Sequence, residues 1–189
     1  MDPVASAVEQ AFEAMPRTRF LARASRWRAG HDGPLQIGHG QTNSQPRTAA
    51  AMLRLLDVRR GQRVLDVGSG SGWTTALLAH LTGPDGAVLG VEIEPDLVRF
   101  GQSNLARTHQ PWASIKPALP DVLGLPDSAP YDRILVSAEP SDLPSDLVDQ
   151  IGRSGRMVIP VDGTMLLVVR ASGNVTVTPH GSYRFVPLR

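Results

Sequence analysis

The sequence predicts an α/β fold with a doubly wound, mostly parallel sheet and a β-rich C-terminal end. Three observations favour it. An apolar strand at residues 64–67 runs into glycines at alternate positions, Gly68, Gly70 and Gly72, and a helix-compatible run follows. From there to residue 161 strand-like and helical segments alternate, which is typical of a parallel sheet flanked by helices. After residue 162, β-like segments follow one another with turn residues between them.

The composition limits the classes of protein to consider. The chain has 189 residues, a formal net charge of +1 and no cysteine. We expect one domain over 1–189, with a helical and loop segment at 1–60, a ligand-binding core at 61–161 and a β-rich tail at 162–189. The near-neutral charge favours neither nucleic acid nor an anionic membrane as a partner. Without cysteine there are no disulfides or thiolate metal sites, which is compatible with the cytoplasm. We expect a cytoplasmic protein without a bound metal. We also expect a monomer.

The N-terminal part shows two helices and a gap between them. The first helix is expected to begin at Asp2-Pro3, because proline suits the first helical turn, and to end before Pro16. Residues 17–43 show no periodic pattern, so we expect one long ordered loop there, of the kind that is often functional. A second helix is expected at about 45–56.

The remaining elements follow in a regular order. Strands are expected at 63–67, 87–91, 113–116, 133–137 and 156–161, helices at 73–81, 96–108 and 143–151, and β-like segments at 165–170, 174–178 and 183–188. Ligands in open parallel sheets bind beyond the carboxyl ends of the strands. This rule places the glycine loop, Glu92 and Ser137 on one rim.

The glycine loop and two acidic residues define a candidate ligand site. Glycine lacks a Cβ atom, so a ligand can approach the backbone N–H groups of such a loop closely. Glu92, about 20 residues further on, is placed to accept hydrogen bonds from ribose hydroxyls. The dinucleotide pattern G-x-G-x-x-G would need glycine at Trp73. Asp66 before the loop resembles instead the acid of S-adenosylmethionine (SAM) sites in class I methyltransferases, which serves the positively charged methionine end.

Beyond this loop, the chain resembles the protein-L-isoaspartate O-methyltransferases over nearly its whole length. The matching segments, in order, are MPRTRF (15–20), IGHGQTNSQP (37–46), VLDVGSGSGW (64–73), VEIEPDL (91–97), LGLPDSAPYDRI (123–134), GRMVIPV (155–161) and FVPL (185–188). Many methyltransferases share the glycine loop. The GQTxSQP, APYD and FVPL segments are much more specific, and their order adds to the resemblance.

The resemblance implies a reaction and a set of residues. SAM would give its methyl group to the α-carboxylate of an L-isoaspartyl residue in a damaged protein or peptide, leaving S-adenosyl-L-homocysteine. The ester would then lose methanol, close to a succinimide and hydrolyse partly to aspartate. The active-site serine falls on Ser44. Cofactor contacts are expected at Asp66, Gly68, Ser69, Gly70, Ser71, Gly72, Glu92 and Asp121. Substrate contacts are expected at Gly40, Thr42, Asn43, Ser44 and Val186.

The implied chemistry fits the absence of a catalytic base. A carboxylate has a reference pKa of about 4, so it is ionised at neutral pH and needs no base to react. Catalysis can then come mainly from alignment of the reacting atoms. The fourth strand ends in VSAEP at 136–140 and not in the (Asn/Asp)-Pro-Pro-aromatic motif of enzymes that methylate base amino groups.

Three positions depart from the family pattern. Asn43 stands where the family has an apolar residue, and Thr18 stands in place of the acid of an Arg-Glu pair. Pro120 takes the position of the aspartate that meets the adenine. Since proline offers no carboxylate, Asp121 would have to replace it through a shift of the loop by one residue.

These departures leave two other functions open. Asn43 and Thr18 lie in substrate-side segments, so the chain could methylate the carboxylate of a dedicated peptide or small metabolite. Pro120 also allows a non-catalytic binding module on a methyltransferase scaffold. Individual residues have simpler interpretations too: Ser44 as a helix N-cap, and His39 as a surface histidine.

Overall fold

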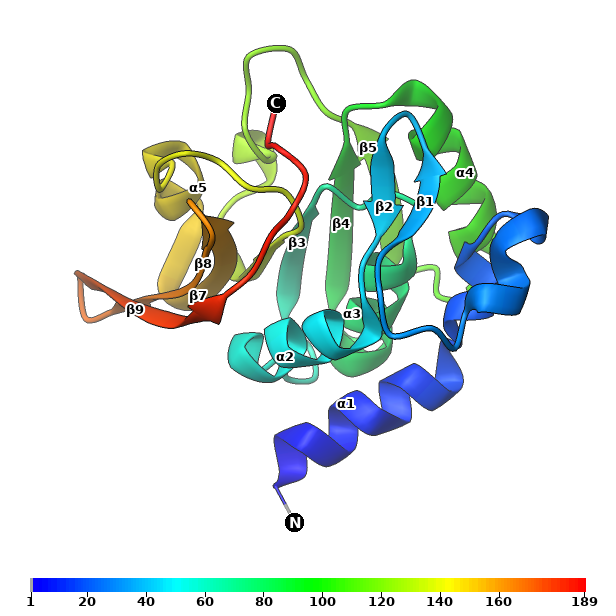
Figure 1. Cartoon of the computed structure of the whole chain (residues 1–189). Coiled ribbons are helices and arrows are strands. Elements are labelled where there is room, and N and C mark those ends of the chain that lie inside the picture. Colours follow the sequence, from blue (N-terminus) through cyan, green and yellow to red (C-terminus); the bar gives the residue numbers. More distant parts are fainter. Residues whose placement is uncertain (1) are drawn as a thin grey trace.

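A seven-stranded sheet in the order β5-β4-β3-β6-β7-β8-β9 forms the centre of the protein (Figure 1). The computed structural model describes residues 2–189. The strands are β3 (Arg63–Val67), β4 (Ala87–Glu92), β5 (Ala113–Pro117), β6 (Tyr131–Val136), β7 (Ile151–Val161), β8 (Thr164–Ala171) and β9 (Asn174–Ser182). The neighbours from β5 to β7 pair in parallel, and β7, β8 and β9 pair antiparallel. The predicted fold class, including its β-rich end, is confirmed.

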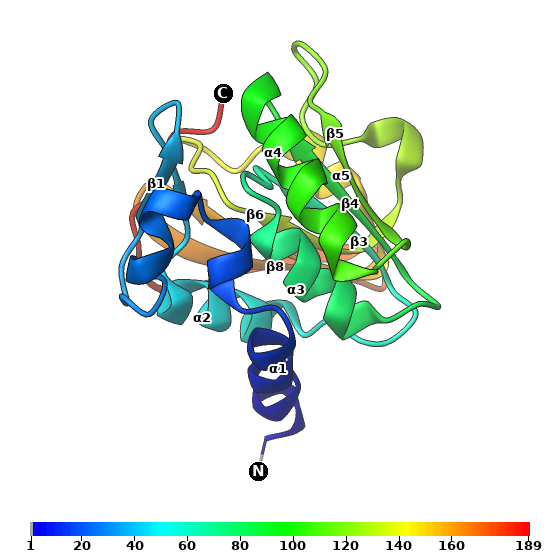
Figure 2. The ribbon, with the colours of Figure 1, turned by 90° about the vertical axis from the view of Figure 1, so that its right-hand side faces the viewer.

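Helices cover both faces of this sheet. The α-helices are α1 (Pro3–Ala14), α2 (Pro46–Leu56), α3 (Trp73–Thr82), α4 (Pro95–Leu105) and α5 (Ser145–Asp149). The first four share one apolar cluster with side chains of the sheet, and Figure 2 shows them gathered on one side. The short α5 packs through the buried Leu147 into a second cluster. None of the helices in the described part of the chain is long and apolar enough to cross a membrane.

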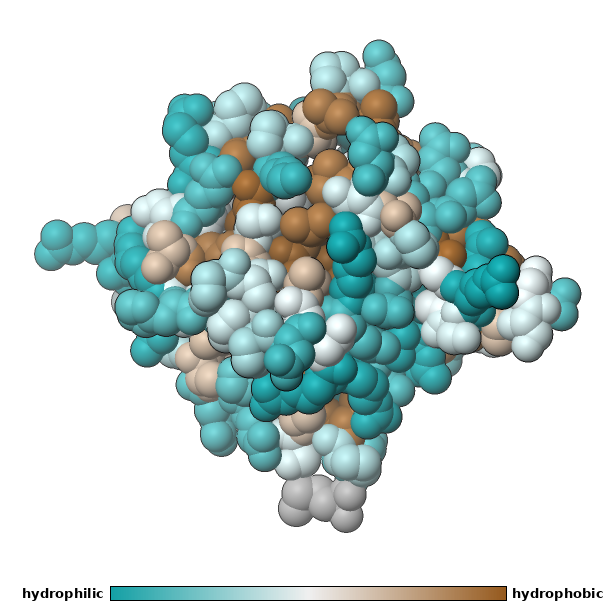
Figure 3. Space-filling view, turned by 180° about the vertical axis from the view of Figure 1, so that it is seen from behind, coloured by the Kyte–Doolittle hydropathy of each residue, from teal (hydrophilic) through white to brown (hydrophobic). Residues whose placement is uncertain are grey.

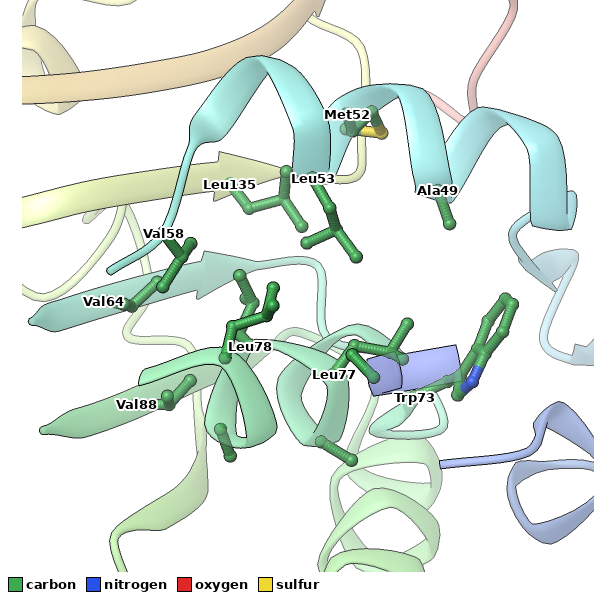
Figure 4. Packing of buried hydrophobic residues seen from close by; sticks show 14 of the residues in the cluster. Ala49, Met52, Leu53, Val58, Val64, Trp73, Leu77, Leu78, Val88 and Leu135 are labelled. Atoms are coloured by element: carbon green, nitrogen blue, oxygen red, sulfur yellow. The ribbon is translucent and has the colours of Figure 1, made fainter. Parts of the chain in front are cut away.

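The first cluster positions the two helices that border the candidate site. Leu53 of α2 and Leu77 and Leu78 of α3 are fully buried and point toward the strands (Figure 4). Trp73 opens α3 and meets Phe12 of α1 edge to face, with ring centroids 5.3 Å apart. Aromatic pairs of this geometry add to the stability that their burial supplies. The start of α3, directly after the glycine loop, is therefore firmly anchored.

The second cluster lies between α5 and the strands. It contains Leu65, Ile134 and Met157, all fully buried. A view from behind shows apolar residues near the centre of the surface within a polar surround (Figure 3). The first and second clusters together form two apolar layers, one on each face of the sheet.

The prediction of a single loop at residues 17–43 is wrong. The segment contains two 3-10 helices, η1 (Arg17–Phe20) and η2 (Arg23–Arg28), and a hairpin of β1 (Leu35–Gly38) and β2 (Gln41–Asn43). These elements are too short to show a hydrophobic period in the sequence. The Arg17 guanidinium holds them together by donating to the carbonyls of His31, Gly33 and Asn43.

Several predicted boundaries also differ: β7 begins at residue 151 and not 156, β9 ends at 182 and not 178, and residues 183–188 form no strand. The helix expected at 143–151 is only one turn long, because Pro144 precedes it and β7 already begins at Ile151. The helix expected at 96–108 ends as an α-helix at Leu105 and continues as the 3-10 turn η3 (Ala106–Thr108). The fourth 3-10 turn is η4 (Pro126–Ser128).

Candidate functional site

The glycine loop leaves the carboxyl end of β3 in a conformation that favours glycine. Its backbone φ angles are +77° at Gly68, +51° at Gly70 and +85° at Gly72. This left-handed region is open to glycine and strained for most other residues. At Gly72 a Cβ atom would also lie 3.1 Å from the carbonyl oxygen of Gly101 in α4. The glycines therefore permit both the turn and the close approach of α4.

The first three N–H groups of the loop donate hydrogen bonds within the protein. Those of Gly68 and Ser69 donate to the Val91 carbonyl at 2.9 and 3.0 Å. The N–H of Gly70 donates to Glu92 Oε2 at 2.8 Å. They are not free donors, contrary to the expectation from the glycine pattern. The loop offers a ligand bare backbone surface and the carboxylate that it holds.

Glu92 lies at the end of β4 with its side chain largely buried, 6% exposed. Its Oε1 accepts the N–H of Glu94, so both carboxylate oxygens are oriented by the backbone. Glu94 itself is the residue before α4 and pairs with Arg189 at 2.8 Å.

Asp66 lies beneath the loop and is fully buried. Its Oδ2 accepts hydrogen bonds from the hydroxyls of Thr74 at 2.8 Å and Thr75 at 2.7 Å. Burial raises the pKa of Asp66 to about 6, against the opposing effect of the two hydroxyls. Its Oδ1 has no partner among the described residues, and neither have the buried hydroxyls of Ser69 and Ser137. A polar ligand near the loop could satisfy such groups.

A cavity of about 710 Å³ opens over this edge of the sheet, and we call it the cofactor-side cavity. Its volume suits a small-molecule site. Apolar walls come from Val67, Val91 and Leu123. The charged residues on its wall are the three acids Glu92, Asp121 and Asp146 and one cation, Arg189. An apolar cavity with several carboxylates fits a nucleoside that carries a positively charged group. The residues present therefore fit SAM.

Two contacts join α4 and the residue before it to segments that line this cavity. His39, at the tip of the β1–β2 hairpin, places Nε2 3.0 Å from Asp96 Oδ2. Arg189 near the C-terminal end pairs with Glu94. The interpretation of His39 as a plain surface histidine is thus incomplete, because it ties the hairpin to the start of α4.

A second cavity, of about 620 Å³, lies beside the first, and we call it the acceptor-side cavity. Ser44 and the start of α2 form one wall, and residues 182–186 of the tail form the other. The charged residues on its wall are Arg47 and Arg184, with no carboxylate among the described residues that line it. Its charge is therefore opposite in sign to that of the cofactor-side cavity.

Thr42, Ser137 and Val186 line both cavities, and we call this shared border the neck. They come from β2, from the end of β6 and from the tail. Ser137 was expected on the same rim of the sheet as the glycine loop, but no pattern in the sequence assigned it a contact. The neck is the place where a group held in one cavity can meet a group held in the other.

The remaining expected residues divide into two groups. Gly68, Gly70, Glu92, Asp121, Thr42, Ser44 and Val186 line one or both of the large cavities. Asp66, Ser69, Ser71, Gly72, Gly40 and Asn43 do not. Asp121 is exposed with a φ of +58°. Its proposed contact with the adenine stays a prediction.

Ser44 and Asn43 have different environments despite being neighbours. Ser44 is half-buried on the acceptor-side wall, and the N-cap of α2 is Gln45 without a capping side chain. The N-cap interpretation of Ser44 is therefore wrong. The Asn43 side chain is buried, accepts from Arg17 Nε at 2.6 Å and donates to Ser71 Oγ at 3.0 Å. It lines neither large cavity, and its expected contact with a substrate stays a prediction.

The tail is held over both cavities by Glu139, which follows β6. Its carboxylate accepts the N–H groups of Gly163 and Phe185. Its backbone N–H donates to the Val186 carbonyl at 2.8 Å, and its carbonyl accepts from Leu188 at 2.9 Å. No sequence signal pointed to Glu139. This clamp explains how an extended tail without a long strand partner keeps Val186 at the neck.

Comparisons with known proteins agree with this geometry. The family model "Protein-L-isoaspartate(D-aspartate) O-methyltransferase (PCMT)" matches residues 4–189. A protein-L-isoaspartate O-methyltransferase of Methanothrix thermoacetophila is 42% identical over 188 residues, which covers 98% of this chain and 89% of the relative. One from Methanopyrus kandleri is 43% identical over 187 residues, which covers 96% of this chain and 82% of the relative.

Solved structures show the same fold. A structure from Plasmodium falciparum, assigned to the protein-L-isoaspartate O-methyltransferases and in complex with S-adenosyl-L-homocysteine, superposes with a TM-score of 0.86 at 26% identity. The superposition covers 100% of this chain and 92% of the Plasmodium falciparum chain. A second protein-L-isoaspartate O-methyltransferase gives a TM-score of 0.87 at 23% identity, with 98% of this chain and 62% of that chain covered, and supports the fold alone. The chain belongs to the protein-L-isoaspartate O-methyltransferase family, with the class I SAM-dependent methyltransferase fold.

Proposed function

We propose that this chain repairs proteins by transferring a methyl group from SAM to the α-carboxylate of L-isoaspartyl residues. The observation that carries this proposal is the neck. It joins a cavity with acidic walls, which suits a cationic donor, to a cavity with basic walls, which suits a carboxylate. The repair activity of the relatives in this family supports the same reaction.

The residues around the cofactor-side cavity would hold SAM in distinct ways. Glu92 is oriented to accept hydrogen bonds from ribose hydroxyls, and Asp66, buried beneath the loop, would act on the methionine end through its negative charge. Asp121 is the carboxylate available to the adenine. When bound, SAM supplies a methyl group on a positively charged sulfur, and the carbon–sulfur electron pair returns to sulfur as the methyl leaves.

The acceptor side prepares the carboxylate by position. The N-terminal end of α2 carries a partial positive charge and lies on the cavity wall together with Ser44. The Ser44 hydroxyl can donate a hydrogen bond to one carboxylate oxygen and leave the other free to react. No proton has to be removed, because the acceptor is already ionised at neutral pH. Alignment across the neck can therefore supply most of the rate enhancement.

The substrate side also shows how a damaged protein would bind. The N–H of Val186 has no acceptor among the described residues, while its carbonyl is held by Glu139. That N–H is available to an extended peptide chain next to the neck. A segment that can extend in this way must be exposed and flexible. The expected partners are accordingly isoaspartyl-containing proteins and peptides.

The proposal also covers the domain organisation, the oligomeric state and the cellular compartment of the enzyme. We propose that 1–60, 61–161 and 162–189 act as one methyltransferase domain, since the sheet continues from the core into the tail. We also propose a monomer in the cytoplasm. The site is complete within one chain, and a chain without cysteine is compatible with a reducing compartment.

Two observations weaken the argument for a dedicated small substrate. Asn43 is buried against Arg17 and Ser71, and Thr18 is exposed in η1 and lines neither large cavity. Neither side chain therefore lines the acceptor-side cavity. For the non-catalytic alternative, Pro120 still leaves Asp121 on the wall of a full-sized cavity.

The test uses labelled SAM and a pair of peptides that differ only in an isoaspartyl or an aspartyl linkage. We expect methyl ester on the isoaspartyl peptide alone, and a large loss of this ester with Ser44→Ala. Calorimetric titration with SAM and S-adenosyl-L-homocysteine runs in parallel. Binding without ester formation on the isoaspartyl peptide would contradict the repair function and favour the binding-module alternative.

A further inference from the structure

The acceptor-side cavity has a charge pattern that the transfer reaction alone does not require. The isoaspartyl carboxylate brings one negative charge to the neck, beside Ser44 and the positive end of α2. Arg47 and Arg184 add two cations on the wall of the same cavity. A single bound carboxylate does not need both, so other negative charges on the substrate are candidates for their partners.

Arg184 is fixed in position by its neighbours. Tyr183 and Phe185 are partly buried against the main apolar cluster, while Arg184 between them is exposed. The N–H of Tyr183 donates to the Gly163 carbonyl at 2.8 Å, and the N–H of Phe185 donates to Glu139 Oε2 at 2.9 Å. The backbone is thus held on both sides of Arg184, which lies on the wall of the acceptor-side cavity.

The charge of Arg184 is not neutralised by the protein. Within residues 2–189 it forms no ion pair with a carboxylate. It stands two residues before Val186, whose N–H is open to a peptide. A peptide that extends along the tail from the neck would therefore carry its neighbouring side chains past Arg184.

Arg47 adds positive charge from the opposite wall of the acceptor-side cavity. It lies in the first turn of α2, and its guanidinium is 3.2 Å from Asp32. Both side chains are well exposed, at 84% and 38%, so water and salt weaken this pair. Arg47 can therefore leave Asp32 and pair with a substrate carboxylate with little loss of free energy. Arg184 can pair with such a carboxylate without first breaking an ion pair.

We propose that Arg184, assisted by Arg47, makes this enzyme prefer isoaspartyl segments that carry further acidic residues next to the isoaspartate. The proposal rests on the repair function proposed above and names its substrate class. Charges at the edge of a binding site act mainly on encounter and selection, and they are screened by salt. The preference should therefore appear in kcat/KM at low ionic strength and weaken as salt is added.

The experiment compares three peptides of one length, with the isoaspartate flanked by Glu, by Gln or by Lys. We expect kcat/KM to be roughly fivefold higher for the Glu-flanked than for the Lys-flanked peptide at low salt, the size expected of exposed charge pairs. Arg184→Gln should remove most of this ratio, and Arg184→Glu should reverse it. Arg153→Gln, an exposed arginine that lines neither large cavity, removes the same charge and should keep the wild-type ratio.

The outcomes separate this inference from the repair function. If wild-type enzyme methylates none of the isoaspartyl peptides, the repair function itself is wrong. If it methylates all three with equal kcat/KM at low salt, only the acidic preference is overturned. An equal loss of the ratio in Arg184→Gln and Arg153→Gln would also overturn it, because the preference would then come from net charge and not from the cavity wall.

Discussion

The side chain of Asn43 donates to Ser71 Oγ at 3.0 Å and thereby joins the acceptor segment to the glycine loop. Its oxygen accepts from Arg17 Nε, and the same guanidinium donates to three backbone carbonyls. Burial lowers the pKa of Arg17 to about 10, so it stays charged at neutral pH. This network aligns Ser44, the next residue along, with the loop that borders the cofactor-side cavity.

Asn43→Ala should destabilise the protein by about 2 kcal/mol, because it leaves part of a buried guanidinium without an acceptor. Ser71→Ala removes only one neutral acceptor and should cost about 1 kcal/mol. Urea unfolding of both single variants and the double variant measures this. Since the two residues share one bond, the double variant should cost less than the sum. Strict additivity would show that the bond between them is not formed in solution.

The sequence predicted the core of the fold well, for a physical reason. In β3 and β4 apolar runs end in an acid next to turn residues, and both strands agree with prediction to within one residue. The hairpin at Leu35–Asn43 was missed, because its order comes from Arg17, far away in sequence. Local patterns cannot show a contact of this kind.

The candidate site divides in the same way. Glu92 and the glycines were recognisable from spacing within one βαβ unit. The neck could not be recognised from spacing, because Thr42, Ser137 and Val186 lie on three separate segments. Asn43 was expected to contact the substrate, and in the structure its side chain is buried against Arg17 and Ser71. Which way such a side chain points depends on Arg17 and Ser71, and neither partner is visible from its neighbours in sequence.

Ser44→Ala should lower kcat by roughly 10- to 100-fold, the range expected for losing a hydrogen bond to a charged group. It should leave stability nearly unchanged, since the Ser44 side chain does not cap α2. Steady-state kinetics and thermal unfolding together test this. Ser114→Ala, at an exposed position on the edge strand β5, serves as the matched control. A fall in stability with unchanged kcat would assign Ser44 a structural role.

Glu139→Gln should loosen the tail, because the new amide group cannot accept from both Gly163 and Phe185. We expect KM for the isoaspartyl peptide to rise roughly fivefold, matching about 1 kcal/mol for one lost hydrogen bond. The enzyme should remain folded. Asp142→Asn, an exposed change in the same loop, should have no effect on KM. Equal KM values for the two variants would exclude the clamp.

Asp66 should make stability and cofactor binding depend on pH. Its pKa is raised from 3.8 to about 6 in the folded protein, so folding favours the protonated form. This contribution is complete below about pH 4 and is lost as the pH rises through about 6, a loss of up to about 3 kcal/mol. Asp66→Asn should therefore gain stability relative to wild type between pH 4 and pH 7 in urea unfolding. Parallel stability curves would contradict the raised pKa.

The cationic end of SAM should reverse this effect by favouring the ionised carboxylate. SAM affinity of the wild type, measured by calorimetry, should rise as the pH increases through about 6. In Asp66→Asn this dependence should disappear. An unchanged pH dependence in the variant would place the responsible group elsewhere.

The most direct test is a crystal structure with both S-adenosyl-L-homocysteine and an isoaspartyl peptide bound. The account predicts the nucleoside in the cofactor-side cavity against Glu92, and the peptide carboxylate beside Ser44. The sulfur should face that carboxylate across the neck formed by Thr42, Ser137 and Val186. A nucleoside bound outside this cavity, or a peptide carboxylate away from the neck, would contradict it.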